Sequence, residues 1–280
     1  MNRAKWPLTL GLVLALALAF SGAVDRIGFD YTDQGFKRAL VAFAMARGLN
    51  GVISVAQGTE VAIQPAGVGV NFTPGQILDP INDLVERFSW VMLLAATSLG
   101  VQKLLLGMFS VTGFNLVLGA VVLTGVIALW SERFREALGG RWLLRGVLLM
   151  LLLRFAVPVA AMLNEALYSG FMQTQYEQST QAIEQATADI SRLNRSTEQS
   201  LAGKSQDDSL LGSAKRLYAS ALESFDIQAY VERYRNAAAD VSEQVVNLIV
   251  IFIMQTVVVP LLFLWGMLQL AKRTLRLESD

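Results

Sequence analysis

One arginine in the middle of an apolar run is the residue of this chain best placed to do chemistry. Arg154 lies inside the run from Trp142 to Leu163. A charged side chain at the centre of a bilayer costs at least about 2.5–3.5 kcal/mol, so it usually faces a polar partner or a water-filled cavity. Three interpretations are open. Arg154 bonds to a neighbouring helix, or it attracts an anion or a lipid headgroup together with Lys103, or the span is shifted and Arg154 lies at a shallower depth.

The charge of Arg154 needs compensation, and the sequence offers several partners. No acidic residue lies inside an apolar run. We therefore expect the partner to be Asn115, Gln255, a backbone carbonyl, a lipid phosphate or a transported anion. Lys103 is the single charge in the 90–130 stretch and is the only cation that could assist Arg154 from within that stretch.

Two prolines inside apolar runs are candidate hinges. Pro260 lies in the last apolar run of the chain, and Pro158 lies in the run that carries Arg154. A proline inside a helix removes one backbone hydrogen bond and bends the helix, and neighbouring helices accommodate the bend in a membrane. The sequence leaves open whether each proline is a hinge or a fixed bend.

The residue types for most catalytic chemistry are missing. The chain has no histidine and no cysteine, which excludes thiol catalysis, disulfides, thiolate metal sites and imidazole acid–base chemistry. Its clustered acids are typical of helix caps and solvated faces; they are Asp25, Asp30, Asp33, Asp79, Asp83 and Glu86. We predict that the protein is not an enzyme and carries no metal and no cofactor.

The composition indicates a protein that crosses a membrane several times. Of the 280 residues, 54% are hydrophobic and 16% are charged, whereas a soluble domain carries about 25% charge. Lys plus Arg and Asp plus Glu number 23 each, so the balance of charge gives no reason to expect a nucleic-acid partner. We expect an all-α polytopic membrane protein with the lipid bilayer as its main partner.

The amino-terminal part is expected to hold a targeting segment and a small α+β segment. Residues 1–23 have a basic start, an apolar middle and a small-residue end, which fits either a signal peptide or an uncleaved anchor. Residues 24–78 are predicted to lie outside the membrane, with a helix capped by Thr32 and ended by Gly48. Three short alternating runs then predict a β-meander; they begin at Ile53, Val61 and Val68.

The membrane-embedded part is predicted at residues 79–166, with a helix beginning at Asp79-Pro80 and a tight turn within 110–115. A basic loop follows at residues 131–141. The last span is predicted at residues 244–271 and is followed by a basic tail, residues 272–280. Short basic loops usually face the cytoplasm.

Residues 167–243 are predicted to form a helical-hairpin, coiled-coil stalk outside the membrane. Apolar residues recur there at spacings of three and four, with a polar connection at 196–209. The three apolar sets begin at Ile183, Leu211 and Ile227. This seam either holds the stalk together or pairs with a protein partner or a second copy.

The basic flanks do not fit five full spans. With a cytoplasmic amino terminus, five spans would place the loop 131–141 and the tail 272–280 on the outer side. We favour an arrangement in which the 90–110 stretch is a re-entrant or in-plane helix that does not cross, with Lys103 reaching a headgroup. The alternative is five full spans with a cytoplasmic stalk. The expected location is a bacterial inner membrane, with the stalk in the periplasm.

Two functions from different classes remain. The first is a non-enzymatic scaffold or assembly component that acts through its stalk, by self-association or with a protein partner. The second is a channel or transporter for an anion or small solute that uses Arg154 and Lys103. The two differ in one structural feature: a conduit requires Arg154 to line a continuous polar cavity, whereas a scaffold allows it to be sealed between helices.

Overall fold

The computed structural model describes residues 5–58, 61–63, 70–72, 78–131, 133, 140–202 and 227–276. These residues are almost entirely helical, as predicted. Five helices are long and apolar enough to cross a membrane; they are Ala23–Gly58, Asp79–Ser110, Thr112–Trp130, Arg145–Arg195 and Glu232–Leu270. A shorter apolar helix, Lys5–Ser21, precedes them. The chain is therefore a helical, multi-pass membrane protein.

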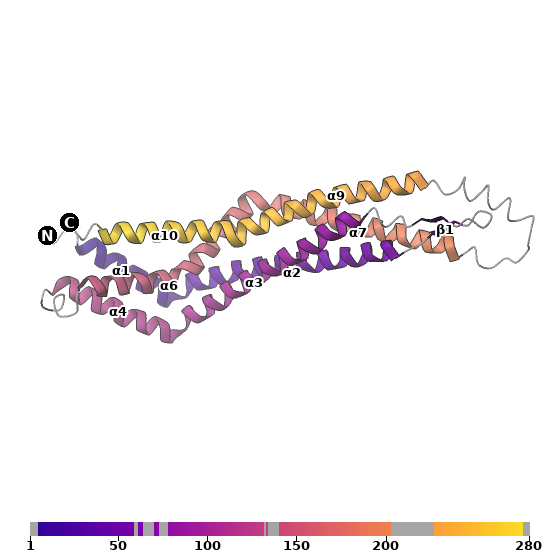
Figure 1. Ribbon diagram of the computed structural model, residues 1–280. Coiled ribbons are helices and arrows are strands. Elements are labelled where there is room, and N and C mark those ends of the chain that lie inside the picture. The colour runs from indigo at the N-terminus through magenta and orange to yellow at the C-terminus, as the bar shows by residue number, and fades with distance from the viewer. Residues whose placement is uncertain are drawn as a thin grey trace, which may run out of the picture. The chain divides into compact units, whose positions relative to one another are not determined.

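The elements follow one another with few interruptions in the described residues (Figure 1). In chain order they are α1 (Lys5–Ser21), α2 (Ala23–Gly58), β1 (Val61–Ile63), β2 (Val70–Phe72), α3 (Asp79–Ser110), α4 (Thr112–Trp130), α6 (Gly140–Leu167), η3 (Tyr168–Met172), α7 (Gln173–Ala202), α9 (Ile227–Ile253), η4 (Met254–Val258) and α10 (Val259–Arg276). The segments η3 and η4 are single π-helical turns within otherwise α-helical stretches.

The chain divides into two compact units. Unit 1 comprises residues 1–39, 94–172 and 252–280, and unit 2 comprises residues 40–93 and 173–251. Three boundaries fall inside α2, α3 and α9, each of which contributes one end to unit 1 and the other end to unit 2; the fourth falls between η3 and α7.

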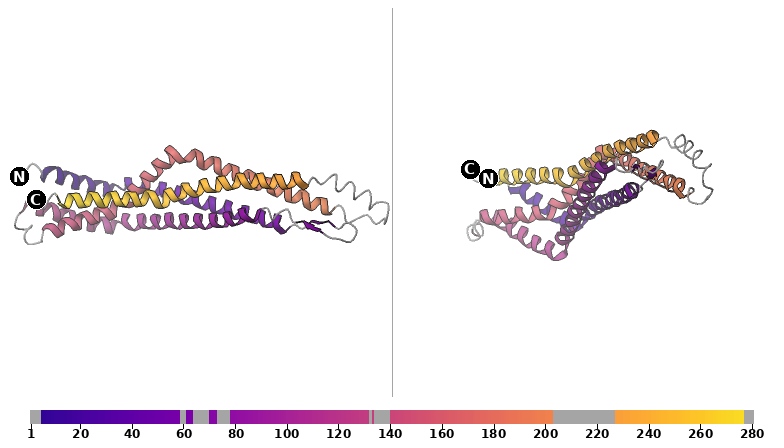
Figure 2. Two further views of the ribbon diagram at one scale, coloured as in Figure 1. Left: turned by 45° about the horizontal axis from the view of Figure 1, so that its top comes forward. Right: turned by 45° about the vertical axis from the view of Figure 1, so that its right-hand side comes forward.

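Unit 1 is a packed group of apolar helices. In it α1 packs on α4, α4 packs on α6, and α6 packs on α10. The starts of α1 and α6 and the end of α10 lie at the same end of this unit in all views (Figures 1 and 2). Leu12, Leu118, Val122 and Val147 form a buried core between α1, α4 and α6. The outward faces of the same helices carry many exposed leucines, valines and tryptophans, a surface that requires a lipid environment.

The described residues of unit 2 form a bundle of four helical segments with a mostly apolar interior. The last part of α2, the first part of α3 and the helices α7 and α9 contribute to it. Its fully buried side chains recur at helical spacing; they include Leu49, Ile53, Phe88, Ile183, Ile190, Tyr234, Val241 and Val245. The seams predicted from Ile183 and Ile227 therefore face the interior of the bundle over the residues described. The set that begins at Leu211 lies outside the described residues.

The segment predicted as a small α+β unit is different in the structure. Residues 23–58 form one helix, α2, which itself counts among the candidate spans. The Thr32 hydroxyl donates to the Gly28 carbonyl (2.7 Å) inside this helix and caps nothing. Gly48 lies within the helix, as does the run at Ile53 that was predicted as a strand. Burial of one face of α2 overrides the local preferences of these residues.

Two of the predicted alternating runs contain short strands. Within the described residues β1 and β2 form an antiparallel pair in which Val61 lies opposite Phe72 and Ile63 lies opposite Val70. Each strand has three residues. A three-stranded meander and an α+β segment are therefore not what the structure shows.

Two predicted boundaries are confirmed. Helix α3 begins at Asp79, where the Asp-Pro start was predicted. It ends at Ser110 and α4 begins at Thr112, which places the tight turn within 110–115 as predicted. Residues 196–202, predicted as the start of a polar connection, belong to α7, and the rest of that stretch lies outside the described residues.

Candidate functional site

Arg154 is sealed inside unit 1 by three helices. Its side chain, on α6, is 1% exposed. The guanidinium makes a two-pronged ion pair with both carboxylate oxygens of Asp25 on α2. Its Nε donates to Oδ1 of Asn115 on α4 (2.8 Å), and Nη2 donates to the carbonyl oxygen of Ala19 on α1 (3.0 Å). The planar guanidinium suits this two-pronged geometry, which is the strongest form of carboxylate pairing.

The turn between α1 and α2 is what brings Asp25 to Arg154. Gly22 has a φ of 64°, a left-handed conformation that glycine adopts without cost. The helix is interrupted there, and Asp25 follows within the first turn of α2. Asn115 was among the partners that the sequence offered. Asp25 was missed, because it was interpreted as part of a solvated acidic cluster.

Lys103 has a carboxylate partner of its own. Its Nζ lies 2.6 Å from Oδ1 of Asp33, whose other oxygen lies 2.8 Å from Nζ of Lys37. The Lys103 ammonium also lies 5.0 Å from the ring centroid of Phe29. Among the described residues no hydrogen bond or ion pair joins Lys103 to Arg154. The predicted reach of Lys103 to a lipid headgroup is therefore replaced by a pair within the protein.

A second buried polar cluster lies in unit 1. Nη2 of Arg38 lies 2.8 Å from Oε2 of Glu165, and both side chains are mostly buried. The Arg38 guanidinium also lies 3.7 Å from the ring centroid of Tyr168, which belongs to the π-helical turn η3. Cation–π contact with an aromatic face adds to the ion pair where water is excluded.

Gln255, the fourth sequence candidate, belongs to this second cluster and not to the Arg154 network. Its backbone carbonyl accepts a hydrogen bond from Nδ2 of Asn164 (2.8 Å). Its side chain is 2% exposed, and its Nε2 has no partner among the described residues; the same holds for Oδ1 of Asn164. A cavity of about 10 Å³ lies beside these two atoms and is lined by Thr32, Arg38 and Glu165 among others. It has room for about one water molecule.

The two candidate prolines sit in different surroundings. Pro260 follows directly on the π-helical turn η4, in which the Val259 N–H bonds to the Met254 carbonyl. A proline cannot donate to the carbonyl four residues before it, which explains a local change of helical winding at this place. Pro158 lies inside α6, which continues past it, and packs against Gly28. Whether either proline acts as a hinge stays a prediction.

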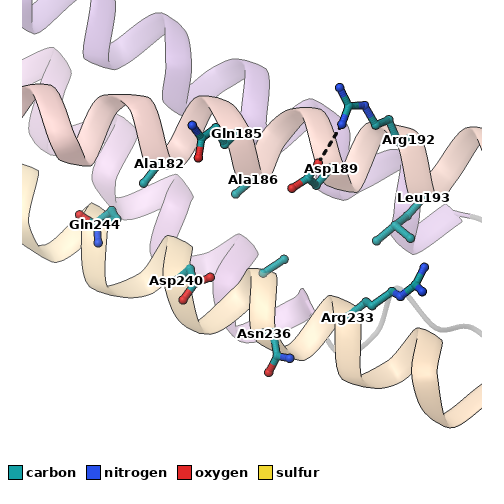
Figure 3. A pocket seen from close by; sticks show the side chains of 11 residues that line it. Ala182, Gln185, Ala186, Asp189, Arg192, Leu193, Arg233, Asn236, Asp240 and Gln244 are labelled. Atoms are coloured by element: carbon teal, nitrogen blue, oxygen red, sulfur yellow. Dashed lines mark hydrogen bonds and ion pairs between the residues drawn. The ribbon is translucent and has the colours of Figure 1, made fainter.

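Unit 2 carries a groove between α7 and α9 (Figure 3). The two helices are tied together by Ser179 and Gln244 (2.9 Å) and by Tyr234 and Asn194 (2.9 Å). The groove has a volume of about 690 Å³ and a floor of small residues. Its lining comprises Ala182, Gln185, Ala186, Asp189, Arg192, Leu193, Arg233, Asn236, Ala237, Asp240 and Gln244.

Charge is distributed unevenly along this groove. Arg192, Leu193 and Arg233 lie toward one end, whereas Ala182 and Gln244 lie toward the other (Figure 3). Asp189 bonds to Arg192 at 3.3 Å, and both side chains are largely exposed. The groove was not predicted, because sequence periodicity marks buried seams and not the shallow surface left between two helices.

No metal site is evident in the part of the chain that the structure describes, where no group of three or more acidic side chains could hold an ion. Comparison with known proteins adds no relative. No family model, no curated protein and no solved structure matches this chain.

Proposed function

We propose that this protein is a non-enzymatic membrane scaffold that holds a helix of a protein partner against its helical bundle. The observation that carries the proposal is the groove between α7 and α9, whose floor of alanines lets a helix backbone approach closely. An aqueous bundle that exposes such a groove is suited to helix-in-groove recognition.

The charges of the groove define the partner. Arg233 lies at one end beside the Arg192–Asp189 pair, and Asp240 lies two helical turns from Arg233 along α9. A matching helix carries an acidic residue near the cationic end and a basic residue about two turns further along. Such complementarity sets the direction and register of the bound helix more than it sets its affinity.

The alternative function, a conduit for anions, loses support at Arg154. A guanidinium that pairs with Asp25 and bonds to Asn115 and Ala19 is neutralised and enclosed. Lys103 is paired in the same way with Asp33. Neither cation is positioned to attract a solute, so we do not propose transport.

The proposal includes a topology in which α1, α4, α6 and α10 cross a bacterial inner membrane. Helix α7 is polar over most of its length, and its Asn194 bonds to the Val52 carbonyl of α2 (3.1 Å). The end of α2 must therefore share the aqueous side of α7, and α2 and α3 together add no crossing. All basic flanks then lie in the cytoplasm, and unit 2 lies in the periplasm.

Site-directed photocrosslinking in cells tests the scaffold function. We expect benzoylphenylalanine at Gln185 or Asn236 in the groove to give one discrete adduct with another protein. The neighbouring exposed positions Glu184 and Arg235 serve as matched controls and should give none. Reversal of the groove charges with Arg233→Glu and Asp240→Lys should abolish the adduct at Gln185. Three outcomes would refute a partner helix in the groove. They are an adduct that persists after the charge reversal, an adduct of twice the chain's own mass, and no adduct at all.

Cysteine labelling tests the topology, and the absence of native cysteine makes the background clean. We expect Ser54→Cys on α2 and Ala188→Cys on α7 to react with a membrane-impermeant maleimide in intact spheroplasts. Arg133→Cys should react only after lysis. Protection of Ser54→Cys together with labelling of Ala188→Cys would mean that α2 crosses the membrane.

A further inference from the structure

A further cavity lies on the outside of unit 1 where α2 begins and α3 ends, next to the Asp25 end of the Arg154 network. Its volume is about 370 Å³, within the range of small-molecule sites. It is lined by Asp25, Arg26, Phe29, Asp30, Leu106 and Ser110. The lining thus combines an apolar wall with charges of both signs.

Two of these charges are available to a ligand. Asp25 is already paired with Arg154. Arg26 and Asp30 are exposed, and neither side chain has a hydrogen bond or ion pair with any residue that the structure describes. Residues four apart on a helix lie on the same face, with Cβ atoms about 5–6 Å apart. The cavity therefore offers one cation and one anion side by side.

In the proposed topology the cavity lies at the depth of the lipid headgroups. Helix α1 ends at Ser21 and α4 begins at Thr112, so Arg26 lies one turn beyond the proposed span and Asp30 lies one further turn away. These steps correspond to about 6 Å and 12 Å along the helix. Exposed apolar side chains adjoin the cavity in sequence; they include Phe20, Met108 and Val111.

We propose that this cavity binds a zwitterionic aminophospholipid of the phosphatidylethanolamine type. In such a lipid the phosphate lies nearer the hydrocarbon core and the ammonium lies further out. Arg26 meets the phosphate with charge-assisted hydrogen bonds, and the Asp30 carboxylate accepts from the ammonium. Phe29 and Leu106 pack against the glycerol and the upper acyl chain. The order of the charges along α2 thus matches the order of the groups in the lipid.

The lining discriminates between lipid classes. An anionic lipid finds Arg26 but meets the Asp30 carboxylate, and inorganic phosphate leaves Asp30 without a partner. A choline headgroup keeps the charge but has no N–H to donate to Asp30, so it should bind less well. This site rests on the membrane placement of α1 and α4 proposed above, and not on the groove of unit 2.

Native mass spectrometry of the full chain in detergent, with lipids added in equal amounts, tests the site. We expect phosphatidylethanolamine to bind roughly tenfold more tightly than phosphatidylglycerol. Asp30→Asn should reverse this preference, because it removes the carboxylate that repels anionic lipid. Arg26→Gln should weaken the binding of both lipids. The double variant Arg26→Asp with Asp30→Arg exchanges the two charges. It should not restore the binding of phosphatidylethanolamine, because the cation then lies further from the hydrocarbon core than the anion.

The exposed pair Asp83 and Arg87 on α3 has the same spacing and supplies the control. Asp83→Asn with Arg87→Gln should leave lipid binding unchanged. Equal binding of all lipids, or lipid preferences that the Arg26 and Asp30 variants do not alter, would overturn the site. So would binding of inorganic phosphate alone at the affinity of the lipid. The photocrosslinking result in unit 2 is independent of each of these outcomes.

Discussion

The two units of this chain differ in the charged side chains that they bury. In unit 2 the interior is mostly apolar, with Ile183, Ile190 and Val241 each about 1% exposed, and its buried polar side chains are uncharged; they include Ser89, Ser179 and Asn194. In unit 1 the interior holds Arg154 and Gln255, whereas Leu104 and Leu116 are more than half exposed. In the proposed topology, each unit buries the side chains that its surroundings would contact least favourably.

Because of this difference, the interactions that stabilise unit 1 are not the same as those that stabilise unit 2. In the proposed topology unit 2 faces water, which makes the burial of apolar surface its main stabilising term. In that topology α1, α4, α6 and α10 of unit 1 face lipid, which is as apolar as leucine, so their association relies on close packing and on polar pairs. The two units should therefore respond in opposite ways to loss of a charge and to loss of a methyl group.

The largest effect is expected from breaking the buried pair of unit 1. Asp25→Asn leaves the Arg154 guanidinium buried without its counter-charge and should destabilise unit 1 by about 3–5 kcal/mol. Thermal unfolding in detergent measures the change. The double variant Asp25→Leu with Arg154→Leu should recover much of the loss, because no buried charge remains. A loss no greater than that of the exposed control Asp83→Asn would contradict this account.

A smaller but still large effect is expected in the interior of unit 2. Ile190→Ala removes buried methyl groups from the seam and should cost about 2–5 kcal/mol, measured by unfolding of the bundle in urea. The comparison is Leu104→Ala in unit 1, at a side chain that is 69% exposed, which should cost well under 1 kcal/mol. Equal losses of unfolding free energy at the two positions would contradict the proposed difference between the units.

The sequence predicted the apolar helices well because each has a long run with few charges. Helices α4, α6 and α10 were placed in this way, and the start of α3 followed from its Asp-Pro pair. Helix α2 was divided wrongly. Its glycines and Thr32 are local signals for ends and turns, but one side of it is a continuous buried face that no local signal reveals.

The polar site was predicted only in part. Arg154 stood out because charge in an apolar run is costly, and Asn115 was a plausible partner. Asp25 lies 129 residues away in sequence and outside every apolar run, so its role depends on the turn at Gly22. Glu165 and Arg38 were missed for a similar reason, since each lies outside every apolar run and the two are far apart in sequence.

A moderate effect is expected where α2 passes close to α6. A Cβ at Gly28 would lie 2.8 Å from both Cα and Cβ of Pro158. Gly28→Ala should therefore separate the two helices and cost about 1–3 kcal/mol, as overpacking does. Gly51→Ala, in the same helix with no atom within 4 Å of the added Cβ, is the matched control. It should be neutral or stabilising by up to about 1 kcal/mol in thermal unfolding, since alanine favours a helix.

The smallest effect on thermal stability is expected at Gln255, and its sign tells whether the buried amide has a partner. Gln255→Leu removes a buried Nε2 that has no partner among the described residues and keeps the backbone carbonyl that accepts from Asn164. Because an unsatisfied donor is costly to bury, this variant should leave thermal stability unchanged or raise it by up to about 1 kcal/mol.

Asn164→Leu is the opposite case, because it removes the hydrogen bond to the Gln255 carbonyl and should cost about 1 kcal/mol. Both substitutions replace an amide with an apolar side chain beside the same small cavity, so they differ mainly in whether a hydrogen bond is lost. Destabilisation by Gln255→Leu equal to that by Asn164→Leu would mean that the Gln255 amide has a partner of its own, such as a water in that cavity. The interior of unit 1 would then be held by solvent as well as by its own side chains.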